Sequence, residues 1–335
     1  MPESGKWKSK LLSSSVPMEY EVARTLVEHG FAIDADYSYA RKDAGITKDF
    51  SVDIRATGHP PFRSSKLLAI IELLVECKHR HRGNKWLFFQ DPNIEDMSPF
   101  TLGHTIRAVD SFSSTFIPAN STDSFDQQAI FCIKGVEIDA SNGNVYDTEV
   151  KHGLAQLQYA LPRLLTDSIR FSICNHQEDN LPFFFCPILL TTSAILVANS
   201  DISIKSVENA SSLEELSVPA RYVVVHSDCN PDFEYHRQSA CSSLAELANH
   251  PATKILDAIR QAGGEYDFRL PSAQCSALAN LDGEKFQRYF SQTIVCSLEH
   301  FADLIKEIKT TAMSAIKSRK KKGAARRSRR KGVRS

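Results

Sequence analysis

Residues 66–79 read KLLAIIELLVECKH, an apolar run that carries Glu72, Glu76 and Lys78 toward its end. Alternation along a strand places these three side chains on one face with Leu74 and leaves the other face wholly apolar. Such a strand is typical of the centre of a sheet, where both faces are covered. Charged groups buried there need partners. The stretch is therefore either part of a functional cluster or a local Glu–Lys pair that satisfies itself.

The composition is that of a globular protein with a full core, at 335 residues, 42% hydrophobic and 24% charged. This length suits one large domain or two ordinary ones. The net charge is zero, but eleven of the 40 basic residues lie from Lys317 onward, which leaves 29 basic against 40 acidic residues elsewhere. A mildly acidic body with a strongly basic tail predicts contact with phosphates.

The eight cysteines form no Cys-x-x-Cys pair and show no metal-ligand spacing with histidine. We therefore expect reduced, mostly buried thiols, as in a cytoplasmic protein. The N-terminus lacks the apolar segment of a signal peptide. The longest apolar stretch, residues 181–198, is interrupted by Pro182 and Pro187, so we expect core strands there and no membrane span.

The order of elements predicts a mixed α/β fold. A helix from Pro17 to Gly30 is followed by three strands, then by a helix in which Gly153 and Pro162 are unfavourable, and by further strands. Four regions are expected along the chain: a flexible N-terminus at 1–16, a domain at 17–230 with an insertion at about 80–150, a mostly helical region at 231–316, and a disordered basic tail at 317–335. Within the insertion, residues 80–128 are expected to be polar and irregular and residues 129–139 to form a strand.

Two further acidic residues stand in unusual places. Glu19 falls at the centre of the apolar stripe of the first helix, where a charge is costly unless a cation meets it. The simpler interpretation is a helix-start acid favoured by the helix dipole. Asp53 lies in mid-strand, where aspartate is disfavoured, and shares a face with Ser51 and Arg55. The simpler interpretation is the exposed face of an edge strand. The opposite face of this strand carries Val52, Ile54 and Ala56.

Together these side chains offer the chemistry of phosphodiester hydrolysis. Two or three carboxylates held by a sheet make an all-oxygen site for Mg²⁺. The ion polarises a phosphoryl oxygen and lowers the pKa of the attacking water. A lysine beside it positions and deprotonates a water or stabilises a phosphate. Strand pairing can bring Asp53 next to Glu76, and a packed helix can direct Glu19 toward both.

The pattern resembles the PD-(D/E)xK, or restriction-endonuclease-like, nuclease superfamily, whose core is a helix, three strands, a helix and a strand. The stretches MEYEVARTLVEHGF (18–31), DFSVDIRA (49–56) and LLVECKH (73–79) carry the resemblance. The first is similar to Mrr-type endonucleases. The resemblance covers residues 17–79 and extends to the helix at 151–165 and the strand near 187–193. The proline that gives the superfamily its name is absent before Asp53.

The resemblance implies a restriction-endonuclease-like core (α-β-β-β-α-β, a mixed central sheet flanked by helices). Glu19, Asp53 and Glu76 would be ligands of Mg²⁺, for which Mn²⁺ would substitute, and Lys78 would position the water. It also implies a role near the metal for Gln158, which lies within the apolar stripe of the second helix. A core-edge glutamine bonded to the backbone is the alternative for Gln158.

Basic residues follow the motif strand directly and are candidates for contact with the DNA backbone. They are His79, Arg80, His81, Arg82 and Lys85. A solvated loop is the alternative interpretation. The basic tail suits non-specific phosphate binding, although a solubility tail or an RNA-contacting arm has the same composition.

The sequence therefore predicts a metal-dependent DNA endonuclease, cytoplasmic, of a bacterial defence system or a mobile element. RNA as substrate stays open, as do a homodimer and a partner protein of the defence system. The first alternative is a catalytically silent module of the same fold that binds nucleic acid or a protein. The second is a structural subunit in which Glu76 and Lys78 form only a core ion pair.

Overall fold

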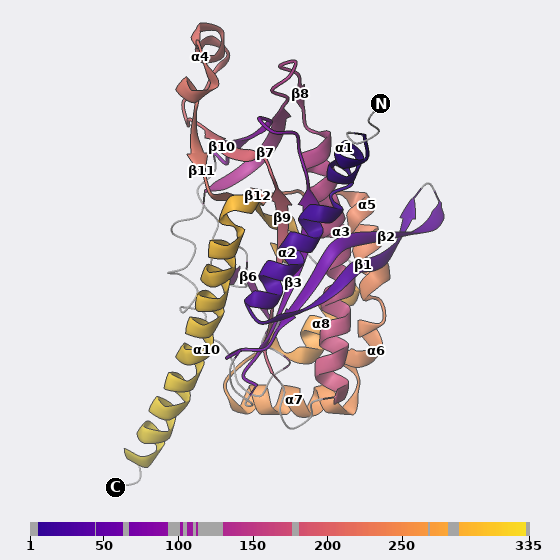
Figure 1. The fold of residues 1–335 in the computed structure, drawn as a ribbon. Coiled ribbons are helices and arrows are strands. Elements are labelled where there is room, and N and C mark those ends of the chain that lie inside the picture. Colours follow the sequence, from indigo (N-terminus) through magenta and orange to yellow (C-terminus); the bar gives the residue numbers. More distant parts are fainter. Residues whose placement is uncertain are drawn as a thin grey trace.

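The computed structural model describes residues 6–43, 45–62, 67–92, 101–102, 106–109, 112, 130–175, 181–266, 269–280 and 288–332. Over these residues one mixed sheet of thirteen strands organises the chain, with helices packed on its two faces (Figure 1). Its main path runs β1-β2-β3-β9-β13-β12-β7-β4-β10-β11. The predicted mixed α/β class is confirmed.

The apolar stretch of residues 66–79 supplies β3 (Ile70–Lys78), in which residues 71–77 are all buried. This strand is paired on both sides, antiparallel to β2 (Ile46–Gly58) and parallel to β9 (Phe183–Thr191). Because both neighbours use its backbone hydrogen bonds and both its faces are covered, the prediction of a central strand is confirmed.

The helix–strand order around β3 follows the sequence prediction. Helix α2 (Val16–Glu28) precedes β1 (Phe31–Asp43) and ends before Gly30, whose φ of 88° suits a residue just beyond a helix. Helix α3 (Thr148–Asn175) leads into β9 and runs unbroken past Pro162. The order α2, β1, β2, β3, α3, β9 is thus a helix, three strands, a helix and a strand.

The strand predicted near 129–139 is confirmed as β7, but the stretch 80–128, expected to be irregular, also adds strands to the sheet. Strand β4 is buried at Trp86, Leu87 and Phe88, so a short continuous apolar run outweighs the polar surroundings of this segment. The strands not yet given are β4 (Lys85–Gln90), β5 (Thr101–Leu102), β6 (Ile106–Val109), β7 (Phe131–Ile138), β8 (Val145–Tyr146), β10 (Ala194–Ala198), β11 (Ser217–Ala220), β12 (Tyr222–His226) and β13 (Gln292–Ser297).

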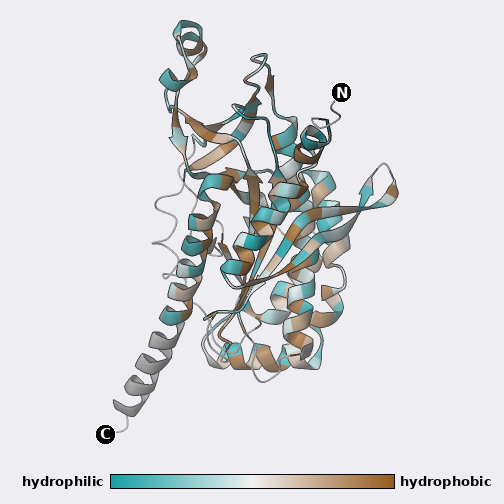
Figure 2. Cartoon of the chain, viewed as in Figure 1, coloured by the Kyte–Doolittle hydropathy of each residue, from teal (hydrophilic) through white to brown (hydrophobic). Residues whose placement is uncertain are grey.

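Two apolar layers sandwich the central strands, which Figure 2 shows as mostly hydrophobic. Alternate residues of β9 divide between them: Leu189 packs with α3 and the later helices, whereas Ile188 and Leu190 pack with α2 and α10. We call these the α3 layer and the α2–α10 layer.

The remaining helices are α1 (Lys6–Ser13), α4 (Ile204–Asn209), α5 (Pro231–Cys241), α6 (Leu244–Ala248), α7 (Pro251–Ala262), α8 (Pro271–Ala279), α9 (Arg288–Ser291) and α10 (Phe301–Gly332).

The C-terminal part belongs to the same body as the predicted nuclease-like region. Strand β13 lies between β9 and β12, near the middle of the sheet, so a boundary at 230/231 does not separate two cores. Helix α10 packs its first half into the α2–α10 layer, and its second half projects from the body (Figure 1). Its backbone is helical through Gly332, where disorder was expected, in keeping with the helix propensity of its lysines, arginines and alanines.

Within the N-terminal segment, α1 occupies Lys6–Ser13 and buries none of its side chains. Residues 1–5 lie outside the described residues. None of the helices in the described part of the chain is both long and apolar enough to cross a bilayer.

The hairpin of β1 and β2 twists sharply at Asp36, which has a left-handed φ of 55°. Before this point Ile54 joins the α2–α10 layer, but beyond it Val52 joins the α3 layer. Val52, Ile54 and Ala56 alternate in burial with Ser51, Asp53 and Arg55, as predicted, but Val52 packs in the α3 layer whereas Ile54 and Ala56 pack in the α2–α10 layer. We call residues 37–52 the arm; its tip extends beyond the body in Figure 1.

A glycine sets the distance between α3 and the sheet. A Cβ on Gly153 would lie 2.5 Å from Cδ1 of Leu189, which is fully buried. We expect Gly153→Ala to reduce the free energy of unfolding by about 1–2 kcal/mol, because overpacking outweighs the gain in helix propensity. Urea denaturation measures this change.

The cost should shrink when Leu189 is first shortened to valine, since the clashing methyl group is then removed. A double-mutant cycle of Gly153→Ala and Leu189→Val should therefore show favourable coupling. Strict additivity of the two substitutions would mean that Gly153 does not set this contact.

Candidate functional site

Asp53 and Glu76 face each other across the β2–β3 ladder. Its last register pair is Ile54–Val75, so the next positions opposite each other are Asp53 and Glu76. The backbone ladder stops there, and Asp53 Oδ2 instead accepts a hydrogen bond of 2.7 Å from the backbone N–H of Cys77. The carboxylate thus takes the place of a strand partner at the point where β2 and β3 part.

Glu76 is a buried carboxylate that is only half satisfied. Its residue is 1% exposed. Oε1 accepts a hydrogen bond of 2.7 Å from Lys78 Nζ, whereas Oε2 is buried and has no hydrogen-bond partner among the described residues. The pKa of Glu76 is raised to about 7, first by burial and then by the Asp53 carboxylate, while Lys78 and the Asp53 backbone N–H act to lower it. Such an acceptor is costly unless a cation or water meets it.

Lys78 is held between two oxygens. Its Nζ donates to Glu76 Oε1 and, at 3.0 Å, to Gln156 Oε1. Gln156 in turn donates from Nε2 to the backbone oxygen of Ser51 at 3.3 Å. The lysine therefore has one ammonium hydrogen without a partner among the described residues, and its position is fixed from both β3 and α3.

Glu19 reaches the same region from α2. Its side chain is half-buried, and its pKa is raised, first by burial and then by the charges of Asp53 and Asp36, while Lys78 acts to lower it. The pKa of Asp53 is likewise raised by burial, against the opposing effects of the Cys77 N–H and Lys78. Glu19, Asp53, Glu76 and Lys78 thus form one electrostatic group, which we call the carboxylate–lysine cluster.

Two of these residues could hold a cation directly. Asp53 and Glu76 present hard oxygen ligands on adjacent strands, and Glu76 Oε2 is free of protein partners in the described part of the chain. Within that part no three His, Cys, Asp or Glu side chains are grouped closely enough to hold a metal ion by themselves. Mg²⁺ commonly takes one or two carboxylates and completes its shell with waters and substrate phosphates.

Gln158 lies away from the cluster. It is buried, and its Nε2 donates to the backbone oxygen of Asp228 at 3.3 Å and to Cys229 Sγ at 3.8 Å. The glutamine that contacts Lys78 is Gln156. Residues two positions apart on a helix point in directions that differ by about 200°, so Gln156 and Gln158 contact different neighbours. The backbone-bonded interpretation of Gln158 is the one that its contacts fit.

The basic residues after β3 divide between ion pairs and surface. Arg80 pairs at 2.8 Å with Glu137, which is 1% exposed, and Lys85 pairs at 2.6 Å with Glu214. Arg80 therefore neutralises a buried acid, a structural role that the sequence did not indicate. Arg82 and His81 are exposed, and His79 is half-buried. Its pKa is lowered by burial and by its basic neighbours His81 and Arg80.

The remaining charge of the β3 face is also paired. Glu72 accepts two hydrogen bonds from Arg55, from Nε at 2.8 Å and Nη2 at 2.9 Å. A third comes from the hydroxyl of Thr57 at 3.3 Å. This bidentate pair satisfies Glu72 completely. Of the two glutamates on this face, only Glu76 keeps a buried oxygen without a partner, so the local-pair interpretation accounts for Glu72 but not for Glu76.

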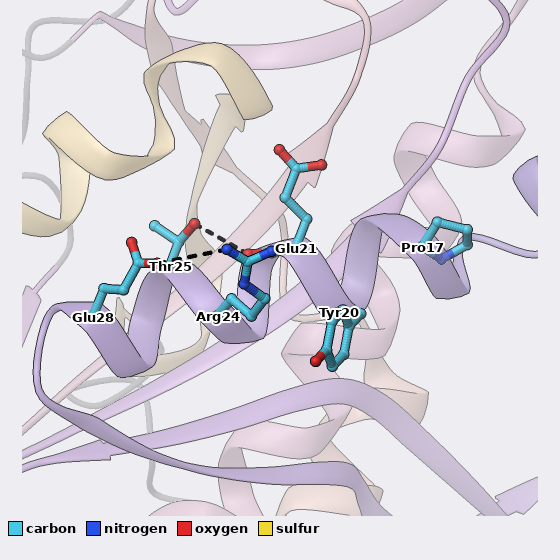
Figure 3. Close-up of a pocket in the computed structure, with 6 residues that line it drawn as sticks. All are labelled: Pro17, Tyr20, Glu21, Arg24, Thr25 and Glu28. Atoms are coloured by element: carbon cyan, nitrogen blue, oxygen red, sulfur yellow. Dashed lines mark hydrogen bonds and ion pairs between the residues drawn. The ribbon is translucent and has the colours of Figure 1, made fainter.

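A pocket on the outer face of α2 is separate from the cluster. Figure 3 shows its lining, with Arg24 paired to Glu28 and Thr25 bonded to the backbone oxygen of Glu21. The lining residues are Pro17, Tyr20, Glu21, Arg24, Thr25 and Glu28. At 100° per residue this stripe points away from Glu19, which lies on the far side of the helix.

No protein-family model, no curated protein and no solved structure matches the chain. Evidence that the carboxylate–lysine cluster is a functional site therefore comes from the geometry of this chain alone.

The half-satisfied burial of Glu76 predicts a pH-dependent penalty in metal-free buffer. The native state keeps a proton on Glu76 up to pH of about 7, whereas the unfolded chain releases it near 4.5, so stability falls as the pH rises through this window. Glu76→Gln lacks this penalty. The stability of the variant relative to wild type should rise by about 3 kcal/mol across the window and level off above it.

Urea denaturation at a series of pH values, with EDTA present, measures this difference. Glu208→Gln, at an exposed position of α4, serves as the control and should show no pH-dependent difference. Parallel pH profiles of wild type and Glu76→Gln would show that Glu76 is not a buried acid of raised pKa.

Proposed function

We propose that the chain is a divalent-cation-dependent nuclease that hydrolyses phosphodiester bonds, with Asp53, Glu76 and Lys78 at its centre. The observation that carries this proposal is the pair of opposed carboxylates, half-buried Asp53 and buried Glu76, in which Glu76 Oε2 has no hydrogen-bond partner among the described residues and Lys78 is held at Oε1. Glu137 and Glu234 also keep a buried oxygen without a hydrogen-bond partner in the described part of the chain, so the opposed Asp53 carboxylate, and not the unpaired oxygen alone, supports the proposal.

The residues fit a divalent cation through their oxygen chemistry. Asp53 and Glu76 would hold it, and Glu19 would add negative charge from α2. When bound, the cation would polarise a phosphoryl oxygen and activate a water. Lys78, with its remaining ammonium hydrogen, would hold that water or the phosphate oxygen in place. Gln156 orients Lys78 and so acts as a positioning residue.

The order of elements supports a restriction-endonuclease-like core as the finer description of the fold. The helix with Glu19, the strand with Asp53 and the strand with Glu76 and Lys78 follow one another as α2, β2 and β3, and α3 and β9 complete the succession. A parallel β9 beside β3 keeps the motif strand buried on both sides. Fold resemblance alone does not define a function, so the proposal rests on the cluster.

Nucleic acid is the substrate that the charge distribution favours. Ten of the eleven basic residues from Lys317 onward lie within α10, whose second half projects from the body. A basic helix of this kind suits phosphate contacts that do not depend on sequence. The alternative, a silent module that binds nucleic acid, shares this feature. Only metal-dependent cleavage separates the two.

Cleavage of supercoiled plasmid is the direct test. With Mg²⁺ or Mn²⁺ we expect nicking that EDTA abolishes, and Lys78→Ala and Asp53→Asn should each reduce its rate about 100-fold or more, because each removes a group that acts on the reacting atoms. Lys205→Ala and Asp201→Asn, at exposed positions, are the matched controls and should keep the wild-type rate. Metal-independent nicking, or equal rates in all variants, would contradict the proposal.

Cation binding is testable without cleavage. Mg²⁺ or Ca²⁺ should raise the melting temperature of wild type, since a ligand at 100 times its Kd stabilises the native state by about 2.7 kcal/mol. The shift should be lost in Asp53→Asn and kept in Asp201→Asn. An equal shift in both variants would place the cation elsewhere.

A further inference from the structure

Helix α3 lies along the arm and contacts it at successive turns. Gln156 reaches the backbone of Ser51, the ring of Tyr159 meets Arg41, and Arg163 Nη1 donates to the Ser38 oxygen at 2.6 Å. Because Gln156 also contacts Lys78, this line of contacts starts at the carboxylate–lysine cluster. Arg41 contacts α3 at Tyr159, which lies three residues, or about 4.5 Å of helix rise, beyond Gln156.

The guanidinium of Arg41 is held on aromatic rings but is not hydrogen-bonded. Its Cζ lies 4.0 Å from the centroid of Tyr159 and 5.4 Å from that of Phe50. Its Nε is buried without a hydrogen-bond partner, and no acceptor for its other N–H groups is found among the described residues. The buried Nε is closed to solvent, so an anion from outside the chain would be met by the two Nη groups, whose N–H donors lie in one plane.

The acidic neighbours of Arg41 are engaged elsewhere. Asp232 accepts a hydrogen bond of 2.8 Å from the hydroxyl of Tyr159. Its charge acts to raise the pKa of His236, whose Nε2 is hydrogen-bonded to the backbone oxygen of Tyr159. Glu76 is paired with Lys78. Both Arg41 and Glu76 affect the pKa of Tyr39, which burial raises, so Tyr39 lies within electrostatic reach of both. The guanidinium is therefore near the cluster yet free to bind an anion.

We propose that Arg41 binds a phosphate of a nucleic acid strand, next to the phosphate that enters the carboxylate–lysine cluster. A planar guanidinium offers two parallel N–H donors to phosphate oxygens. The rings of Tyr159 and Phe50 hold its plane in advance, so little side-chain freedom is lost on binding. The position next to the cluster rests on the proposed function, whereas phosphate binding by Arg41 does not.

The test is binding of a labelled DNA duplex and of its single strand to the full chain, in EDTA, by fluorescence anisotropy at several salt concentrations. Arg41→Ala should weaken binding about 10-fold and reduce the slope of log K against log salt by about one phosphate contact. Arg41→Lys should recover part of the loss, because it keeps the charge but not the planar fork. Inorganic phosphate, at constant ionic strength, should compete with the wild type more than with Arg41→Ala.

Arg170→Ala is the matched control, since Arg170 is an exposed arginine on α3, about 16 Å of helix rise beyond Tyr159. It should bind as wild type does. The proposal is overturned if Arg41→Ala binds like Arg170→Ala at every salt concentration, or if wild type binds neither DNA form. A lowered melting temperature with unchanged binding would assign Arg41 to packing alone.

The two proposals fail separately. Metal-dependent cleavage that is unaffected by Arg41→Ala, together with unchanged binding, would retain the nuclease and reject the Arg41 site. Arg41-dependent binding without cleavage under any metal condition would retain the phosphate site and reject the nuclease.

Discussion

The structure depends on how one buried carboxylate is accommodated. Glu76 lies in a strand that is paired on both edges and covered on both faces, where a charge is expensive. Lys78 donates a hydrogen bond to Oε1, and Oε2 has no hydrogen-bond partner in the described part of the chain. Burial therefore keeps the pKa of Glu76 high in the absence of a cation, and a cation bound there would remove the penalty that the fold carries.

Helix α3 connects this carboxylate to the rest of the molecule. Gly153 lets the helix approach Leu189 of β9, and the same close approach brings Gln156 to Lys78. Further along, Tyr159 supports Arg41 of the arm. A single rigid element thus fixes the lysine of the cluster and the guanidinium beside it.

Much of the cluster follows from strand periodicity, which is a local property. A period of two places Glu76 and Lys78 on one face, and an antiparallel ladder brings Asp53 opposite Glu76. What depends on distant contacts was not predictable. The helix pattern predicts Gln158, because Gln156 lies on the face opposite the apolar stripe, yet tertiary packing places Gln156 against Lys78. The partner of Arg80, Glu137, is 57 residues away. The twist at Asp36, which moves Val52 to the α3 layer, arises from a backbone conformation that no pattern of side chains records.

The central claim is that Glu76 Oε2 and Asp53 share a divalent cation. A crystal structure with Mn²⁺, with data collected at an energy where manganese scatters anomalously, tests it most directly. We expect an anomalous peak within ligand distance of both carboxylates, and its loss in Asp53→Asn crystals. A structure with no peak there, in which Glu76 Oε2 is bonded instead to a protein donor, would contradict it.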